Sequence, residues 1–520
     1  MKHYFLLLLL IGCIASGRAE SGWKAHWINT ERCQSATNTW LAFRKTVHID
    51  KVPQTLTARI AADSKYWLWI NGRLVVFEGG LKRGPSPDDT YYDPVEIASY
   101  LQNGENTIAV LVWHFGKSGF SHVNSGLAAL LFEAVAPGIE IVSDKSWQCT
   151  VYDAYQNTGA PYPNYRLPES NIRFDARMEM SGWNQPGYTG KMPNAEVISP
   201  VGGVPLGKLV ERPIPLWKDY GLKPYVSVRR SAAGDTLYCR LPYNSQVTPY
   251  LKVEASAGKV IHIRTDNYEG GSQYNVRAEY VTRDGVQEYE SLGWMNGHEM
   301  LYILPEGVKV LDVKFRETGY NTEFTGSFSC NDPFMNELWK RSARTLYITM
   351  RDSYMDCPDR ERAQWWLSLI HSPGAPILEK AKQSGASELF ALNPVILLVT
   401  IGGFITNASY CLFQNVKNGT GKDYFSVSGG TLLNNVLFCA LAGVLWYSQF
   451  FGLGMGKSYF ADSPVMLAFS WSILMSRNVI FSNVWGIILK EWKGVSRQTI
   501  IVPICGMCLL IFSLLLPNLI

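Results

Sequence analysis

The sequence predicts a multidomain protein: two β-sandwich-type domains, the start of a helical domain, and an all-α block of four transmembrane helices. Residues 20–330 consist of short apolar and aromatic segments separated by turn residues, which is typical of sheets. After residue 391 charge nearly disappears, because that part holds only seven of the 48 Lys and Arg residues and three of the 44 Asp and Glu residues. The mean hydropathy of −0.04 therefore averages two unlike parts.

The composition excludes several classes of protein. The part before residue 392 has no net charge, so it lacks the positive field that attracts phosphates, and we expect no nucleic-acid partner. The ten cysteines are scattered, which does not resemble a disulfide framework. Cys505 and Cys508 have the spacing of a metal or redox motif, but they lie in an apolar segment without a second ligand pair. Packing is the favoured role, and we expect no metal and no other cofactor.

Residues 1–19 predict an export signal. They have a basic start, a short apolar run and small residues near Ala19, and the run is too short to span a bilayer. An alternative is that Leu10–Cys13 resembles a bacterial lipobox, in which case Cys13 would become a lipidated terminus. Cleavage near Ala19 and lipidation at Cys13 are both left open.

Residues 20–200 predict a β-sandwich resembling a carbohydrate-binding domain. The turn Asn71-Gly72 joins an aromatic strand to its partner in a hairpin. Expected strands are Leu56–Ala61, Tyr66–Ile70, Leu74–Phe77 and Thr107–His114. Aromatic rings can stack on sugars, which makes Trp67, Trp69, Trp113 and His114 candidate ligand contacts, although such residues more often form a core.

Residues 201–330 predict a second β-rich domain, joined to the first by the Pro- and Gly-rich segment Pro200–Pro215. Expected strands are Val260–Arg264, Glu288–Leu292 and Val308–Arg316. The pattern then changes at Asn331, which we expect to cap a helix that ends before Asp352. Apolar residues recur at helical spacing along it, at Phe334, Leu338 and Leu346.

Four long apolar segments in residues 392–520 predict membrane-spanning helices. Each is close to the roughly 20 residues that cross a hydrocarbon layer of about 30 Å. They are Leu392–Phe413, Leu432–Leu453, Pro464–Leu489 and Ile500–Leu516. The first and third connecting loops hold five Lys and Arg residues, against three in the approach and the second loop. This places the approach, and with it the preceding part of the chain, outside the cell membrane.

The segment Asp356–Arg362 combines three carboxylates with two arginines and is followed by Trp365 and Trp366. Hydrolysis of a glycoside needs one carboxylic acid to protonate the leaving oxygen and a second carboxylate to activate water. Sugar pockets also use carboxylates, Arg and aromatic faces. The alternative, favoured by the chemistry alone, is a charged helix start whose arginines lie on a solvated face.

The run RDSYMDCPDRERAQWW, residues 351–366, resembles the start of the catalytic barrel of bacterial α-L-rhamnosidases of glycoside hydrolase family 78. The stretches DSKYWLWINGR, RFDARMEMSGW and TEFTGSFSCNDPFMNELWKRSARTL support this resemblance, which covers about residues 23–366. It implies an (α/α)6 barrel and an inverting mechanism. It also implies that Glu361 matches the general acid, Asp356 and Arg360 match sugar contacts, and Trp366 matches the pocket aromatic.

The resemblance stops after Trp366. Leu367-Ser368 stand where the family has Gly-Asp, and the segment that would supply the general base does not follow. Residues 331–366 thus correspond to a truncated start of the barrel, and residues 367–391 form a junction. An active site without its enclosing helices lacks preorganisation, so we expect little or no hydrolysis.

Residues from about 374 onward resemble the C-terminal four helices of L-rhamnose–proton symporters of the drug/metabolite transporter superfamily. The matching runs are LLVTIGGFITNASYCLFQ, NNVLFCALAGVLWYSQFFGLGMGKS and FSNVWGIILKEWKG. That family has ten helices, so about six would be missing. Polar residues inside the apolar segments are candidates for a sugar path, with helix–helix hydrogen bonding as the alternative. They are Asn407, Asn435, Gln449 and Arg477.

Together these resemblances predict a protein of L-rhamnose utilisation that joins two incomplete parts. The expected partners are rhamnose or rhamnosides, protons if transport is retained, and the lipid bilayer, with a homo-oligomer left open. The expected location is the bacterial inner membrane, with several spans and an exported, periplasmic N-terminal part. An alternative function is a membrane-anchored rhamnoside-binding module without catalysis. The fusion itself arises either from neighbouring genes joined by deletion or misassembly, or as a natural tethered protein.

Overall fold

The computed structural model divides the chain into two units, residues 1–372 and 373–520. The predicted export signal with Cys13, and residues 367–374 of the expected junction 367–391, lie outside the described residues. The structure describes residues 22–30, 37–80, 84, 88–119, 122–163, 167, 169, 171–199, 201–202, 205–266, 276–359, 362, 375–387, 390–391, 393–421, 426, 429–459, 479–484, 486–487, 504 and 506–507.

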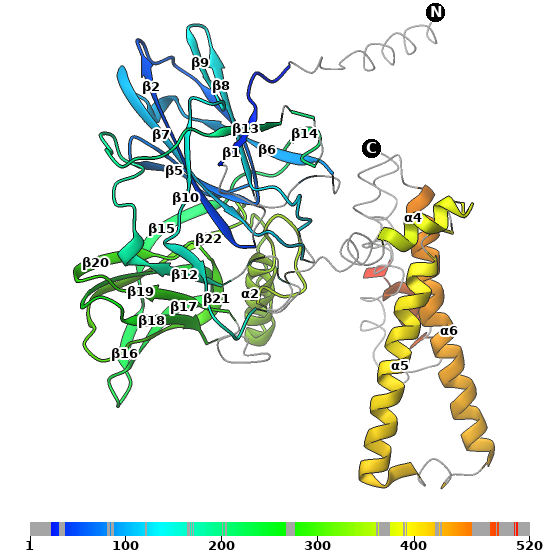
Figure 1. Ribbon diagram of the computed structural model, residues 1–520. Coiled ribbons are helices and arrows are strands. Elements are labelled where there is room, and N and C mark those ends of the chain that lie inside the picture. Colours follow the sequence, from blue (N-terminus) through cyan, green and yellow to red (C-terminus); the bar gives the residue numbers. More distant parts are fainter. Residues whose placement is uncertain are drawn as a thin grey trace, which may run out of the picture. The chain divides into compact units, whose positions relative to one another are not determined.

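The first unit begins with the predicted β-sandwich (Figure 1). One sheet has the order β13 (Glu196–Ser199), β1 (Trp27–Asn29), β8 (Ala129–Ala136), β3 (Thr57–Asp63), β6 (Thr90–Glu96), β14 (Leu209–Glu211), with β9 (Ile139–Val142) beside β8. The other has the order β10 (Gln148–Val151), β2 (Thr39–Ile49), β7 (Gly104–His114), β4 (Lys65–Ile70), β5 (Arg73–Gly79).

The hairpin of β4 and β5 forms as the sequence predicts. Asn71 and Gly72 both have positive φ, 52° and 76°, which matches the tight turn that an Asn-Gly pair favours. Side chains alternate across β4, so Tyr66 and Leu68 enter the core between the two sandwich sheets. Trp67 points to the opposite face of the five-stranded sheet and joins a different core.

A ten-stranded sheet makes up the rest of this unit. Its main order is β11 (Tyr155–Asn157), β12 (Ile172–Asp175), β19 (Ala278–Val281), β18 (Val260–Thr265), β21 (Met295–Ile303), β17 (Thr236–Ala255), β22 (Lys309–Gly319), β15 (Lys218–Pro224). Two further strands, β16 (Ser227–Arg230) and β20 (Gly285–Glu290), pair with β17. The three strands expected in this region are therefore present.

The expected boundary at residue 200 does not separate the sheets. Strands β11 and β12 precede it but belong to the ten-stranded sheet, where β12 runs parallel to β19. Strand β14 follows it but pairs with β6 of the sandwich. The physical reason is that backbone donors and acceptors of these short segments are satisfied by the neighbouring sheet edge, whichever side of the Pro-rich segment they lie on.

The five-stranded sheet is buried on both faces. Trp40, Trp67 and Trp113 project from it into one continuous core with Tyr280 and Phe315 of the ten-stranded sheet. Trp40 and Trp113 stack with ring centroids 4.6 Å apart. Because apolar side chains are buried on both of its faces, this sheet joins the core of the sandwich to the core that it shares with the ten-stranded sheet.

Helix α2 (Pro333–Ile348) follows the ten-stranded sheet. The capping residue is Asp332, not the expected Asn331: its Oδ1 accepts a hydrogen bond from the Phe334 N–H, and Pro333 occupies the first turn. The residues that recur at helical spacing are exposed rather than buried. Phe334 is 70%, Leu338 45% and Leu346 43% exposed.

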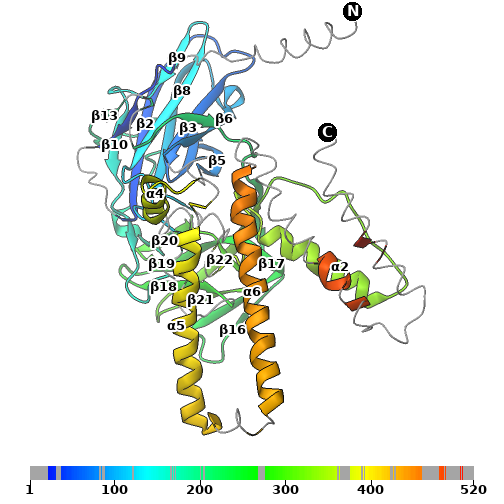
Figure 2. The same cartoon turned by 90° about the vertical axis from the view of Figure 1, so that its right-hand side faces the viewer.

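The second unit contains three described helices, α4 (Ala375–Gln383), α5 (Asn393–Asn418) and α6 (Gly429–Tyr459). Figures 1 and 2 both show α5 and α6 lying side by side as a helical hairpin. These two helices coincide with the first two expected spans, whereas most of the third and fourth lies outside the described residues. Within the described part of the chain, no helix has the combined length and apolar character required to cross a membrane.

Candidate functional site

Residues 351–362, called the charged segment below, follow shortly after α2, and the side chain of Arg351 at their start is buried. Its Nη1 donates to Gln246 Oε1 at 2.5 Å, and its Nη2 lies 3.2 Å from Glu78 Oε1. The guanidinium stacks between two aromatic rings, 4.6 Å from the centroid of Trp217 and 4.7 Å from that of Trp294. Burial lowers the pKa of Arg351, and the carboxylate of Glu78 opposes that effect.

Arg362 fixes the other end of the segment. It has a φ of +51° and is 4% exposed. Its Nε donates to the carbonyl of Pro358 at 2.8 Å, and its Nη2 donates to the carbonyl of Trp294 at 3.1 Å. Its guanidinium lies 3.4 Å from the centroid of the Trp294 ring. Trp294 therefore holds both arginines, one at each end of the segment.

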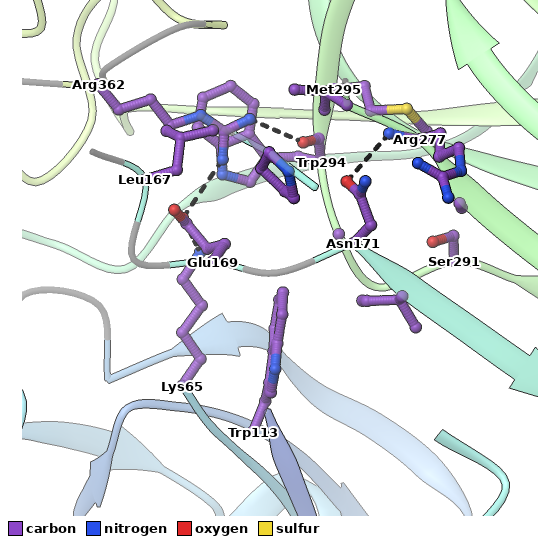
Figure 3. Close-up of a pocket in the computed structure, with 15 residues that line it drawn as sticks. Lys65, Trp113, Leu167, Glu169, Asn171, Arg277, Ser291, Trp294, Met295 and Arg362 are labelled. Atoms are coloured by element: carbon purple, nitrogen blue, oxygen red, sulfur yellow. Dashed lines mark hydrogen bonds and ion pairs between the residues drawn. The ribbon is translucent and has the colours of Figure 1, made fainter. Parts of the chain in front are cut away.

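Three further charges complete a buried network, and Figure 3 shows two of them, Lys65 and Glu169, beside Arg362. Lys65 Nζ lies 2.8 Å from Glu78 Oε1 and 3.2 Å from Glu169 Oε1, and Arg362 Nη1 lies 3.3 Å from the same oxygen of Glu169. Burial would raise the pKa of Glu169, but Lys65 and Arg362 outweigh it and lower that pKa to about 2. Glu169 is therefore ionised at neutral pH. The network ties the segment to the sandwich through β4 and β5.

The network holds the charged segment against the sandwich and leaves little space beside it. The cavity beside it, lined by Lys65, Glu169, Trp294 and Arg362 among others, has a volume of about 30 Å³. That is the space of roughly one water molecule. Each of the five charges is paired with at least one opposite charge of the network. The expectation of arginines on a solvated face is wrong for Arg362, because the Trp294 ring and Glu169 offset the cost of removing the guanidinium from water.

Between these two anchors the segment presents carboxylates at the surface. Asp356 is exposed. Asp359 is partly buried, and its Oδ2 accepts from Asn296 Nδ2 at 3.4 Å. The predicted site residues Arg360, Glu361 and Trp366 lie outside the described residues. The structure thus brings Asp356 to the surface of an anchored segment, and the roles expected of the other three stay predictions.

The transport-path candidates lie in the second unit. Asn435 is exposed on α6. Asn407 is a residue of α5, and Gln449 is a residue of α6. Arg477 lies outside the described residues. Their role in transport stays a prediction. Among the described residues, no group of three or more His, Cys, Asp or Glu side chains is placed to hold a metal ion.

Three of the four aromatic candidates in the sandwich are core residues. Trp67, Trp113 and His114 are at most 1% exposed. The ten-stranded sheet covers the face that holds Trp67 and Trp113, whereas His114, the next residue of β7 after Trp113, points to the other face. Trp113 Nε1 donates to Asn38 Oδ1 at 2.5 Å, and His114 Nδ1 lies 3.2 Å from the carbonyl oxygen of Asp63. Only Trp69 of the four is partly exposed.

Sequence reasoning missed Lys65, Glu78, Glu169 and Trp294. Lys65 carried a signal, since it is the one charged residue in the strand KYWLWI and so must either reach solvent or find an anion. Its partners come from positions 13 and 104 residues away. No local pattern connects residues at such separations.

Two regions of the chain, which overlap at residues 366–369, match models of known protein families. Residues 323–369 match the model of the bacterial α-L-rhamnosidase 6-hairpin glycosidase domain, and residues 366–519 match that of the L-rhamnose–proton symport protein. L-rhamnose–proton symporters of Yersinia pestis (strain Pestoides F) and Yersinia pseudotuberculosis (serotype O:1b) are each 34% identical over 147 residues. That match covers 28% of this chain and 42% of each symporter.

Solved rhamnosidases share the fold of the first unit. A GH78 family rhamnosidase of Bacillus sp. GL1 superposes with a TM-score of 0.58 at 18% identity, over 71% of this chain and 64% of the other. The α-L-rhamnosidase of Aspergillus terreus gives 0.54 at 20% identity, over 67% and 42%. That of Streptomyces avermitilis, complexed with L-rhamnose, gives 0.52 at 17% identity, over 68% and 37%. The chain thus joins a rhamnosidase-like N-terminal part, covering less than two thirds of those enzymes, to a C-terminal part similar to less than half of a rhamnose–proton symporter.

Proposed function

We propose that this chain serves L-rhamnose utilisation, with an N-terminal part that recognises rhamnosides and a C-terminal part that anchors it in the bacterial inner membrane. The proposal rests on the charged segment, which buried contacts of Arg351 and Arg362 hold at both ends. Asp356 is exposed between two buried arginines, both held by Trp294. A carboxylate on a rigid segment is preorganised to accept hydrogen bonds from sugar hydroxyls. Arg360 and Trp366 would contribute a second polar contact and a ring face.

Recognition without efficient hydrolysis is the form of activity that we propose. An inverting glycosidase needs two carboxyl groups about 6.5–9.5 Å apart, one as acid and one as base. Glu361 matches the position of the acid. The match to the glycosidase domain ends at residue 369, where the match to the symporter has already begun. The general base that the resemblance implies lies beyond the matched region, so we expect binding to survive and turnover to be lost.

Titration calorimetry with L-rhamnose and a hydrolysis assay on p-nitrophenyl α-L-rhamnoside test this proposal on the purified full-length chain. We expect saturable binding that Asp356→Asn weakens by at least about tenfold, the value of a charged hydrogen bond. We expect no hydrolysis above background by the unmodified chain or by Glu361→Gln. Hydrolysis that disappears in Glu361→Gln would show that the chain is an active rhamnosidase.

The proposed anchor rests on the similarity of residues 366–519 to rhamnose–proton symporters. Helices α5 and α6 coincide with the first two predicted spans. Because a single copy matches only the last part of a symporter, transport would need a homo-oligomer, and we propose that one copy binds lipid without moving sugar. Alkaline extraction of membranes should leave the chain in the pellet, and externally added protease should cleave its periplasmic part in spheroplasts.

Proton-driven uptake of labelled rhamnose into vesicles separates an anchor from a transporter. If the C-terminal part serves only as a membrane anchor, we expect no uptake of rhamnose above that of empty vesicles, with or without a proton gradient. Uptake that requires the gradient, and that falls in Asn435→Ala and Arg477→Gln, would establish transport and overturn the anchor. Recovery of the chain in the alkaline supernatant would overturn the membrane location.

A further inference from the structure

A second cavity, larger than the one beside Arg362, lies between the five-stranded sheet and the ten-stranded sheet. Its volume is about 270 Å³, the space of roughly nine water molecules. It shares no lining residue with the cavity beside the charged network. Its lining comes from β4 and β5, from Leu111 of β7, from the segment 152–184, and from β20 with Leu292.

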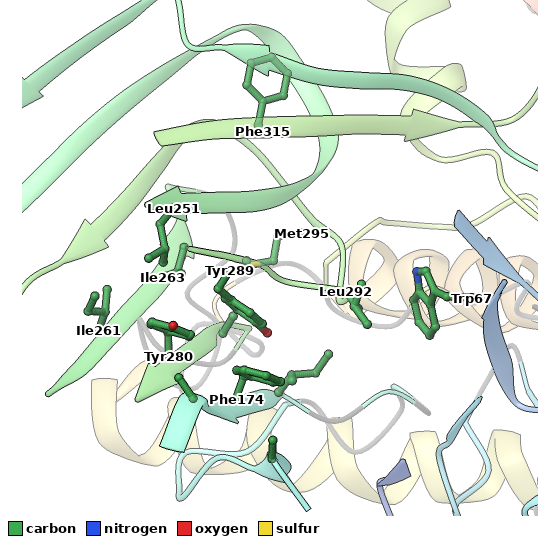
Figure 4. Close-up of a cluster of buried hydrophobic side chains, with 14 of the residues drawn as sticks. Trp67, Phe174, Leu251, Ile261, Ile263, Tyr280, Tyr289, Leu292, Met295 and Phe315 are labelled. Atoms are coloured by element: carbon green, nitrogen blue, oxygen red, sulfur yellow. The ribbon is translucent and has the colours of Figure 1, made fainter. Parts of the chain in front are cut away.

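Aromatic side chains form the walls of this cavity. Trp69 of β4 is partly exposed and meets Trp183 edge-on, with ring centroids 5.8 Å apart. Phe174 and Tyr289 stack on each other at 4.8 Å (Figure 4). Trp67 is also part of the wall, and its indole Nε1–H is a buried donor with no acceptor in the described part of the chain. The walls therefore offer flat ring faces, and two lining residues, Trp67 and Tyr289, carry a buried polar group with no hydrogen-bond partner among the described residues.

Carboxylates give the same cavity a polar side. Arg316 holds Glu290, because its Nε donates to Glu290 Oε1 at 2.6 Å. The guanidinium of Arg316 also lies 4.8 Å from the ring centroid of Phe77, which is another residue of the cavity wall. The Glu288 carboxylate accepts from the Tyr250 hydroxyl at 2.8 Å. Glu179 is held less firmly, at 3.8 Å from Arg283, and its side chain is 30% exposed. These positioned acceptors face a space walled by aromatic rings.

We propose that this cavity binds one neutral saccharide ring, as a subsite separate from the segment around Asp356. A sugar ring has apolar C–H faces, which stack on aromatic side chains, and a rim of hydroxyls, which donate to carboxylates. A purely apolar ligand would cover the weakly held Glu179 without giving its carboxylate a donor, which is unfavourable. An anion would be repelled by the same groups. That the sugar is a rhamnoside rests on the proposed function.

Calorimetry on the full-length chain with methyl α-L-rhamnopyranoside tests the inference by stoichiometry. The unmodified chain should bind two molecules, Asp356→Asn should lose one event, and Trp69→Ala should lose the other. Trp69→Phe, which keeps a ring, should retain the second event. Glu179→Gln, a change at an accessible side chain, should weaken it about tenfold. The matched control Tyr162→Ala removes an aromatic side chain, 67% exposed, that does not line the cavity, and should keep both events.

The experiment gives different results if the cavity subsite is wrong and if the role of Asp356 is wrong. Two unchanged events in both Trp69→Ala and Glu179→Gln would overturn the cavity subsite. So would a single event in the unmodified chain that Asp356→Asn removes. A single event that Trp69→Ala removes and Asp356→Asn leaves intact would instead retain the cavity and overturn the role of Asp356. Binding of p-nitrophenol alone, lost in Trp69→Ala and as strong as that of the glycoside, would show an aglycone site and overturn the saccharide.

Discussion

Replacing Glu169 with Gln tests the buried charge network most directly. The network holds three cations, Lys65, Arg351 and Arg362, and two anions, Glu78 and Glu169. Glu169→Gln leaves the three cations with one carboxylate, while the size of the side chain hardly changes. Arg362 then loses the carboxylate of Glu169 as its partner and stays buried against Trp294. The expected result is a less stable first unit.

Two independent estimates give the size of the effect. The pKa of Glu169 falls from 4.5 to about 2 on folding, which corresponds to about 3 kcal/mol at neutral pH. Breaking a buried ion pair by removing one partner costs roughly 3–5 kcal/mol. Because the folded-state pKa is depressed, this stability is fully present above pH 4.5 and is lost as the pH falls toward 2. The difference between wild type and Glu169→Gln should shrink to roughly 1 kcal/mol at pH 3.

Urea denaturation followed by tryptophan fluorescence measures this difference, at pH 7 and pH 3. The matched control is Glu337→Gln, which breaks the exposed pair with Arg341 and should leave the midpoint unchanged. Equal midpoints for Glu169→Gln and the control at pH 7 would refute the reasoning. A loss that is the same at both pH values would show that the side chain acts through packing and not through its charge.

Three further predictions concern the same segment. Lys65→Met leaves two cations and two anions, so it should cost about 2 kcal/mol, less than Glu169→Gln; an equal or larger loss in urea denaturation would contradict the charge count. Trp294→Leu removes the ring under both arginines and should cost about 2–4 kcal/mol, with faster protease cleavage near Asp356; unchanged cleavage would show that Trp294 does not hold the segment. Asp356→Asn, at an exposed position, should leave the thermal midpoint unchanged while weakening rhamnoside binding; a lowered midpoint would indicate a structural role.

Local sequence patterns predicted much of the fold. The Asn71-Gly72 turn and the alternation along Tyr66–Ile70 are properties of neighbouring residues, and both appear in the structure. The helix after the sheets also appears, although its cap is Asp332. The boundary at residue 200 was wrong because it used composition, whereas β12 and β14 are assigned to sheets by pairing with distant strands.

The sequence predicts where in the chain the candidate site lies, but not how its side chains are arranged. The density of charge in Asp356–Arg362 and the resemblance to rhamnosidases both pointed to this segment. Neither distinguished the buried Arg362 from the exposed Asp356. That distinction depends on Trp294 and Glu169, which approach from other parts of the chain.

By itself, the sequence determined the change from charged β-rich domains to an apolar helical part, the two rhamnose-related resemblances and the position where they meet. These properties belong to single segments, so they are visible without a fold. Only the tertiary structure decided that Trp67 and Trp113 are core residues, that Arg351 and Arg362 are held by one ring, and that a second cavity lies between two sheets. Burial and charge pairing depend on residues far apart in the chain, and only folding brings those residues into contact.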